Sequence, residues 1–180
     1  TYTVTPSKDE HVFAPASRSV TVGPSATGKD FTATRKTYSA SGKVTVGGVG
    51  VGGVTVDAGG GRTATTAADG PYTITGLVAG NYTVTAAKSG YTVSPASRAV
   101  AMGPDASGVD FTLTLETFSI SGRITAGRLG LAGATVTASD GAGHVGSAVT
   151  ATDGSSVIPG PVASGYTVTP TKPVHRVIPF

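Results

Sequence analysis

The chain repeats itself at intervals of about 80 residues. The segment TYTVTPSK at the start returns as NYTVTAAK in the middle and as GYTVTPTK near the end. Tyr2, Tyr82 and Tyr166 mark this position three times, at spacings of 80 and 84 residues. A repeat of this length corresponds to a small domain and is longer than one turn of a solenoid. The 180 residues are therefore copies of one domain.

Further matches fix where each copy starts and stops. APASRSVTVGP returns as SPASRAVAMGP, GKDFTAT as GVDFTLT, and YSASGKVT as FSISGRIT. Residues 38–117 form one complete repeat. Residues 1–37 are the C-terminal half of a repeat and hold its last three strands. Residues 118–180 are the N-terminal part of a repeat and lack its last two strands.

The pattern inside a repeat is that of β-strands. In YTVT, YTIT and DFTLT, apolar residues alternate with Thr, so that one face of each strand is apolar. Asp-Gly pairs at Asp69 and Asp153 are typical of tight hairpin turns, and no stretch has helical periodicity with caps. Short strands between Gly and Pro turns predict an antiparallel sandwich. Seven strands are expected in the complete repeat, near residues 38–45, 53–57, 62–67, 71–76, 81–87, 97–102 and 108–115.

The apolar positions of these strands predict the core. The expected core residues of the complete repeat are Ala40, Val44, Val54, Val56, Tyr72, Ile74, Tyr82, Val84, Val100, Phe111 and Leu113.

Composition excludes several classes of protein. Without cysteine the chain has no disulfide, no thiolate metal site and no cysteine nucleophile. The 13 Lys and Arg residues are scattered along the chain, so no nucleic-acid partner is expected. The charge-free apolar stretch between Lys43 and Asp57 is too short to span a bilayer and is rich in glycine, so no membrane insertion is expected. No basic leader opens the chain, which favours a mature or excised piece.

The segments SGKVT, GVGGVTV, ADGPYTITGL and GNYTVTAAKSGYTV resemble the carboxypeptidase-regulatory-like repeats of bacterial and archaeal surface proteins. Those repeats share a prealbumin-like (transthyretin-like) sandwich with the collagen-adhesin B-type repeats. The resemblance covers the whole chain and implies tandem antiparallel seven-stranded prealbumin-like (Ig-like) β-sandwiches. It implies little about activity, because this fold has many functions. In the third unit the segment SVIPGP departs from the pattern, which puts the strand pairing there in question.

Some members of these families cross-link a Lys of the first strand to an Asn or Asp of the last strand, with help from a buried Glu. Lys43 and Asp110 occupy roughly those places. The only glutamates, Glu10 and Glu116, lie on no middle strand, and Arg123 replaces the Lys in the third unit. A solvated Lys and an Asp beside a turn are therefore expected instead of a cross-link.

Two glycine-rich segments resemble nucleotide-binding loops without their context. GPSATGK at residues 23–29 is followed by Asp30, where a phosphate loop needs Ser or Thr, and GAGHVG at residues 141–146 matches GxGxxG. Both adjoin expected strands and lack the following helix that would bind an anion. We expect ordinary turns there, and no cofactor.

The polar residues do not form a catalytic or metal-binding pattern. His11, His144 and His175 lack metal-ligand spacing, and the acids are too sparse and separated to give calcium several oxygen ligands at one site. No nucleophile-elbow sequence is present. We therefore predict no metal site, no catalytic residue and no enzymatic activity.

The incomplete end repeats carry the sharpest hypothesis. An incomplete sandwich exposes apolar core and unpaired strand edges. The two ends can close on each other, the N-terminal strands of one molecule can complete the C-terminal part of the next, or the sequence can be a window from a longer array. Strand addition between copies would be head to tail and would make a filament. The residues expected at such a subunit interface are Val4, Val20, Val22, Phe31, Ile120, Ile124 and Val168.

The sequence thus predicts an extracellular or cell-surface structural protein, a filament or stalk subunit that self-associates head to tail. The alternative is an adhesin or carbohydrate-binding accessory module of a larger secreted protein. That alternative would need an exposed aromatic platform, for which Phe13, Tyr38, Tyr91 and Phe118 are the candidates.

Overall fold

The computed structural model describes residues 1–172, and every regular element within them is a β-strand. His175 and the last residues of the third repeat lie outside this range. The chain divides into two compact units. The first holds Thr1–Ser89 with Val93–Thr114, and the second holds Gly90–Thr92 with the chain from Leu115 onward. The repeat boundaries after residues 37 and 117 remain predictions from the sequence.

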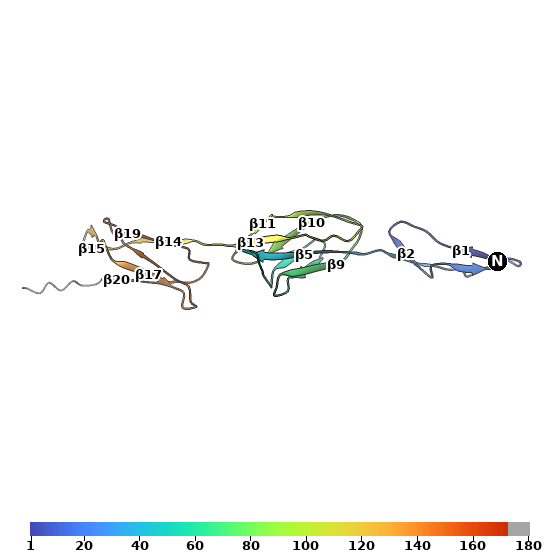
Figure 1. Ribbon diagram of the computed structural model, residues 1–180, viewed down its shortest axis with the longest axis horizontal. Coiled ribbons are helices and arrows are strands. Elements are labelled where there is room, and N and C mark those ends of the chain that lie inside the picture. The colour runs from blue at the N-terminus through green and yellow to red at the C-terminus, as the bar shows by residue number, and fades with distance from the viewer. Residues whose placement is uncertain (173–180) are drawn as a thin grey trace, which may run out of the picture. The chain divides into compact units, whose positions relative to one another are not determined.

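One sheet of the complete repeat has four strands (Figure 1). Its order is β12 (Arg98–Met102), β10 (Gly80–Ala87), β7 (Thr55–Asp57) and β8 (Thr63–Thr65). All three pairings in this sheet are antiparallel. β12 is an edge strand, and its one neighbour in the sheet is β10.

The other sheet is built around the longest strand, β5 (Tyr38–Val46). Its order is β11 (Tyr91–Ser94), β13 (Phe111–Leu115), β5 and β6 (Val49–Gly50), and β9 (Pro71–Leu77) also pairs with β5. β13 runs parallel to β5, whereas β9 is antiparallel to it. The last strand of the repeat therefore adds directly to the first.

The core of the complete repeat lies at the alternating apolar positions. Of the eleven expected core residues, Tyr82 alone is only half-buried, because its hydroxyl group hydrogen-bonds the backbone N–H and C=O groups of Val78, each at 3.2 Å. The others are confirmed as buried. The expected list missed Ala58, Leu77, Ala86, Met102 and Val109, which are also buried.

A strand lies at each of the seven positions expected for the complete repeat. β6 and β11 were not expected. β11, Tyr91–Ser94, lies outside the seven expected strands and pairs with β13 at the edge of the second sheet.

The N-terminal segment holds four strands instead of the three expected. They are β1 (Tyr2–Val4), β2 (His11–Ala14), β3 (Arg18–Val20) and β4 (Thr32–Arg35). β1 pairs with β3 and β2 pairs with β4, both antiparallel. These pairs correspond to β10 with β12 and to β11 with β13 of the complete repeat.

The C-terminal part has strands at the first five positions: β14 (Ser119–Arg123) with β15 (Thr125–Ala126), then β17 (Thr135–Ser139), β18 (Val145–Val149), β19 (Ser155–Pro159) and β20 (Thr167–Thr171). The short strand β16 (Leu129–Gly130) corresponds to β6. β14 pairs with β19 over five positions, so the departure at SVIPGP does not abolish the pairing. β17 lies between β18 and β20, and Val136, Ala138 and Ile158 form a small buried core.

A buried threonine holds the same connection in both units. The Thr66 hydroxyl accepts a hydrogen bond from the Val54 N–H group at 3.0 Å and donates one to the Val51 carbonyl at 2.7 Å. Thr150 does the same with Ala134 and Leu131, at 2.9 and 2.6 Å. The C-terminal part is therefore built on the same framework as the complete repeat.

Candidate functional site

An apolar groove opens on the C-terminal part, between β14 and β20. It has a volume of about 150 Å³. Three of the seven residues expected at a subunit interface, Ile120, Ile124 and Val168, line it together with Val136, Ile158 and Pro170. The structure therefore brings these three predicted residues together around one open space.

In the complete repeat, the last two strands cover the corresponding space. Phe111 and Leu113 of β13 are each 1% exposed, and Val100 and Met102 of β12 are also buried. β13 reaches this position by pairing with β5, where Phe111 lies opposite Val44. The groove is open because no described strand occupies the equivalent positions beside β14 and β20.

One valine position shows the effect of the missing strands in all three copies. Val84, in the complete repeat, is fully buried, with 0% exposure. The same residue of the other copies, Val4 and Val168, exposes 43% and 44% of its surface. The residue type is constant, so the difference comes from the strands that surround each valine among the described residues.

The N-terminal segment has a strand pair equivalent to one of the complete repeat. β1 and β3 pair Tyr2 with Val20, and β10 and β12 pair Tyr82 with Val100 in the same register. Of the remaining predicted interface residues, Val20 is buried within this segment, and Val22 is 61% exposed.

Phe31 is half-buried, although the same residue of the complete repeat, Phe111, is in the core. Its ring centroid lies 6.0 Å from the guanidinium carbon of Arg18. The Arg18 side chain therefore covers part of the Phe31 ring, and the rest of the ring faces solvent.

Arginine and aspartate hold the last strands in the same way in two copies. The Nε group of Arg98 donates to the Asp110 carbonyl at 2.6 Å, and Arg18 donates to the Asp30 carbonyl at 3.0 Å. The Asp110 carboxylate accepts a hydrogen bond from the backbone N–H of Lys43 at 2.7 Å. This carboxylate therefore ties the last strand of the repeat to the first through the backbone, a role that the sequence did not indicate.

A second aspartate ties down the loop before β13. The Asp105 carboxylate accepts a hydrogen bond from the Ser39 N–H group at 2.7 Å. The N-terminal segment has Ser25 at this position. Sequence comparison of the copies marks this difference, but the role of the carboxylate depends on a partner 66 residues away.

The glycine-rich segment at residues 23–29 lies in a connection between strands, and the one at residues 141–146 runs from a connection into β18, so neither leads into a helix within the described residues. The second one closes the hairpin from β17 to β18. The Asp140 carboxylate accepts hydrogen bonds there from the Ala142 and His144 backbones, and its other oxygen lies 2.6 Å from His144 Nδ1. These bonds, the histidine contact first, hold the pKa of Asp140 below its ordinary value. The polar groups of this loop hold its own backbone.

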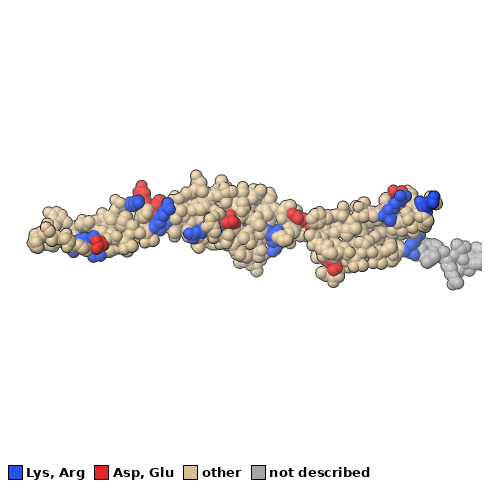
Figure 2. Space-filling view, turned by 180° about the vertical axis from the view of Figure 1, so that it is seen from behind, with Lys and Arg blue, Asp and Glu red and all other residues tan. Residues whose placement is uncertain are grey.

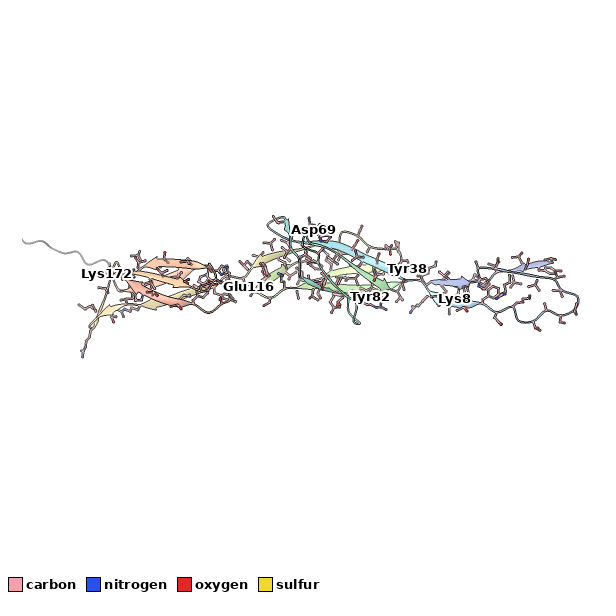
Figure 3. The ribbon with its side chains drawn as sticks, turned by 90° about the horizontal axis from the view of Figure 1, so that it is seen from below. Lys8, Tyr38, Asp69, Tyr82, Glu116 and Lys172 are labelled. Atoms are coloured by element: carbon pink, nitrogen blue, oxygen red, sulfur yellow. The ribbon has the colours of Figure 1, made fainter. Side chains whose placement is uncertain are left out.

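The remaining polar candidates are also engaged locally. His11 Nδ1 lies 2.7 Å from the Asp9 carbonyl oxygen. Hydrogen bonds from the Ser155 hydroxyl and backbone lower the pKa of Asp153. Asp69 lies in the turn before β9, at the opposite end of the β5–β9 pair from Tyr38 (Figure 3). Within residues 1–172, no three His, Asp or Glu side chains are grouped as a metal would require.

The candidate aromatic residues differ in exposure. Tyr38 donates a hydrogen bond to Glu10 at 2.8 Å, and this bond, followed by burial, raises the pKa of Tyr38. Phe13 and Tyr91 are half-buried, and Phe118 is 55% exposed.

Charge is sparse on the face shown in Figure 2, where cations and anions are interspersed.

In the part of the chain that the structure describes, no helix is long and apolar enough to cross a membrane. No family model matches the sequence, and no curated protein matches it.

Solved structures do resemble the fold. The Bacillus anthracis TIE protein matches 79% of this chain with a TM-score of 0.59 at 14% identity. This chain spans 30% of the length of that protein. The streptococcal ancillary pilin matches 78% of this chain and 56% of its own, with a TM-score of 0.40 at 16% identity. A DUF3823 family protein from Parabacteroides merdae matches 72% of this chain and 82% of its own, with a TM-score of 0.34 at 13% identity. The first of these likenesses supports an all-β architecture of small sheets and, at this identity, shows the fold alone.

Proposed function

We propose that this chain is an extracellular structural protein, a filament or stalk subunit of tandem prealbumin-like β-sandwich repeats. In this proposal, the N-terminal strands of one copy fill the groove on the C-terminal part of the next. The observation that carries the proposal is that the N-terminal strands match the strands that the groove lacks. The groove lacks the two strands that cover it in the complete repeat, and the N-terminal segment has strands of the same sequence type in the same register.

The complete repeat specifies how the strands would pair. Phe31 and the start of β4 would add to Ile124 and β15, as β13 adds to the end of β5, which sets Phe31 opposite Ile124. β3 would add to β20, as β12 adds to β10, which sets Ser19 opposite Thr167. The Asp30 carboxylate would then accept a hydrogen bond from the backbone N–H group of Arg123, as the Asp110 carboxylate does from Lys43. The Arg123 side chain would place a positive charge near this carboxylate.

Burial of apolar side chains would drive this association. Phe31, Val22 and Val168 are already partly buried, so completing their burial would contribute about 1–2 kcal/mol each, less than the burial of a fully exposed side chain. Two new strand pairings would satisfy backbone groups that now face water. Association costs about 4–15 kcal/mol in lost freedom, so the apolar contacts and the strand pairings are needed together.

The geometry of the joint would decide the form of the assembly. The groove and the segment that fills it are different surfaces, so the joint is heterologous and each added copy presents a new groove. Such an assembly grows as a filament unless it closes into a ring. The chain contains no cysteine and one methionine, so it offers few sites for oxidation outside a cell.

The experiment is light scattering of the 180-residue chain at several concentrations, with negative-stain electron microscopy. We expect mass to rise with concentration and fibres to appear. Phe31→Asp should give monomers, because the charge would be buried against Ile124. Val49→Asp is the matched control, since Val49 is 72% exposed in the complete repeat and lies outside the groove. A wild-type chain that stays monomeric at all concentrations would refute joining between copies and leave a stalk whose next repeat supplies the strands.

A further inference from the structure

We infer that β1 is an internal cap on the joining strand β3, and that it must leave β3 before two copies can join. This inference rests on the proposed function and names the step that limits it. The edge of β3 that would pair with β20 of a second copy is already paired with β1.

The register shows that both partners use the same edge. β12 is the edge strand of its sheet, so it has hydrogen-bonded neighbours on one side. It pairs Ala99 with Thr83 of β10. β3 pairs Ser19 with Thr3 of β1 at the equivalent positions. A strand that adds to β3 as β10 adds to β12 therefore takes the place of β1.

The second copy supplies its own strand for that place. β20 corresponds to β10, and it pairs with β17 as β10 pairs with β7: Thr171 lies opposite Thr135, and Ala87 lies opposite Thr55. The position beside β17 is thus filled before any other copy arrives. An incoming β1 would have to displace β20 to remain with β3.

β1 is held less firmly than β20. β20 pairs with its neighbour over five positions, and β1 pairs over three. Lys172, directly after β20, is also tied down, because its ammonium group donates to the Ala132 carbonyl, as Lys88 does to Gly52 (Figure 3 labels Lys172). Tyr2 of β1 is 67% exposed. The exchange therefore releases β1 and keeps β20.

The other N-terminal pair does not have to separate. β11 remains beside β13 in the complete repeat while β13 also pairs with β5. The corresponding pair, β2 and β4, can therefore enter the groove intact. Joining therefore breaks the β1–β3 pair and keeps the β2–β4 pair. Locking one pair or the other gives two matched experiments.

The experiment locks each pair with a disulfide in the cysteine-free chain. T3C/S19C locks β1 to β3, and V12C/T34C locks β2 to β4, because each pair lies directly opposite in the ladder. Polymer mass is followed by light scattering before and after reduction. We expect oxidised T3C/S19C to polymerise at least tenfold more slowly than its reduced form. We expect oxidised V12C/T34C to polymerise as fast as its reduced form.

A third variant tests the cap in the opposite direction without a disulfide. Thr3→Pro weakens the pairing of β1, since proline cannot donate to a ladder and fits poorly inside a strand. We expect it to polymerise severalfold faster than the wild-type chain.

Three outcomes would overturn the cap while polymerisation itself stands. They are equal rates for oxidised and reduced T3C/S19C, an equal block in oxidised V12C/T34C, and no acceleration by Thr3→Pro. Failure of the wild-type chain to polymerise would refute the proposed function and the cap together.

Discussion

The backbone of Val109 lies directly against Gly42, so closely that a Cβ atom on Gly42 would clash with the Val109 carbonyl group. The Tyr72 hydroxyl donates a hydrogen bond to the same carbonyl. Gly122 occupies the position of Gly42 in the third copy, and a Cβ atom there would meet nothing within 4 Å. The complete repeat needs Gly42 because Val109 approaches it closely. The third copy has Gly122 at this position, although no described segment approaches it.

Gly122→Val should leave the monomer unchanged and abolish joining. The site is open, so the free energy of unfolding should change by no more than about 0.5 kcal/mol. In the joined state, the new side chain would meet the backbone near Lys29 of the second copy. Gly42→Val is the matched variant and should destabilise the complete repeat strongly. Urea unfolding and light scattering measure the two effects, and a Gly122→Val chain that polymerises normally would contradict the pairing.

Tyr72 should make the complete repeat sensitive to alkaline pH. Burial, with a smaller contribution from the Asp110 charge, raises the pKa of Tyr72 to about 12. The folded-state pKa lies above the unfolded value of about 10, so the stabilisation is fully present below pH 10 and is lost as pH rises through 12. The shift corresponds to about 2–3 kcal/mol.

Urea unfolding between pH 9 and 12 measures this loss. Tyr72→Phe should flatten the pH dependence in that range and cost about 1 kcal/mol at neutral pH through the lost hydrogen bond. Tyr38→Phe is the control, because Tyr38 bonds Glu10 at the other end of β5 and should leave most of the slope. An unchanged slope in Tyr72→Phe would show that other groups cause it.

Thr66→Val and Thr150→Val should destabilise their own units by similar amounts. Each change leaves a buried backbone N–H group without its hydroxyl acceptor and a carbonyl without its donor, which costs about 1–3 kcal/mol. Thr65→Val, at an exposed position of β8, should be nearly neutral. Hydrogen exchange resolved by segment would assign each loss, and equal effects of Thr65→Val and Thr66→Val would contradict this role.

The sequence predicted the strands well because alternation and turn residues are local signals. Ile74 and Val84 are buried where the period-two pattern puts them. β11 was missed because YTVS is short and pairs at an edge, so its partner lies far along the chain. Tyr82 fits the apolar alternation, but its hydroxyl group holds it near the surface.

The candidate site could be predicted only in part. The repeat alignment identified Ile120, Ile124 and Val168 because their equivalents in the complete repeat, Ala40, Val44 and Val84, are core residues. The competition for the edge of β3 could not be predicted in this way. It depends on β1 and β20 having the same place in the ladder, and a register is visible only in three dimensions.

The most direct test of head-to-tail joining is a cross-link between Ser19 and Thr167, which the register of the complete repeat sets opposite each other. A chain with S19C and T167C, oxidised and run on a denaturing gel, should give a ladder of covalent oligomers that reduction collapses. S19C with V145C is the control, since Val145 lies on β18, on the other side of β17. A cross-linked monomer, uncross-linked chains alone, or the same ladder in the control would contradict the account.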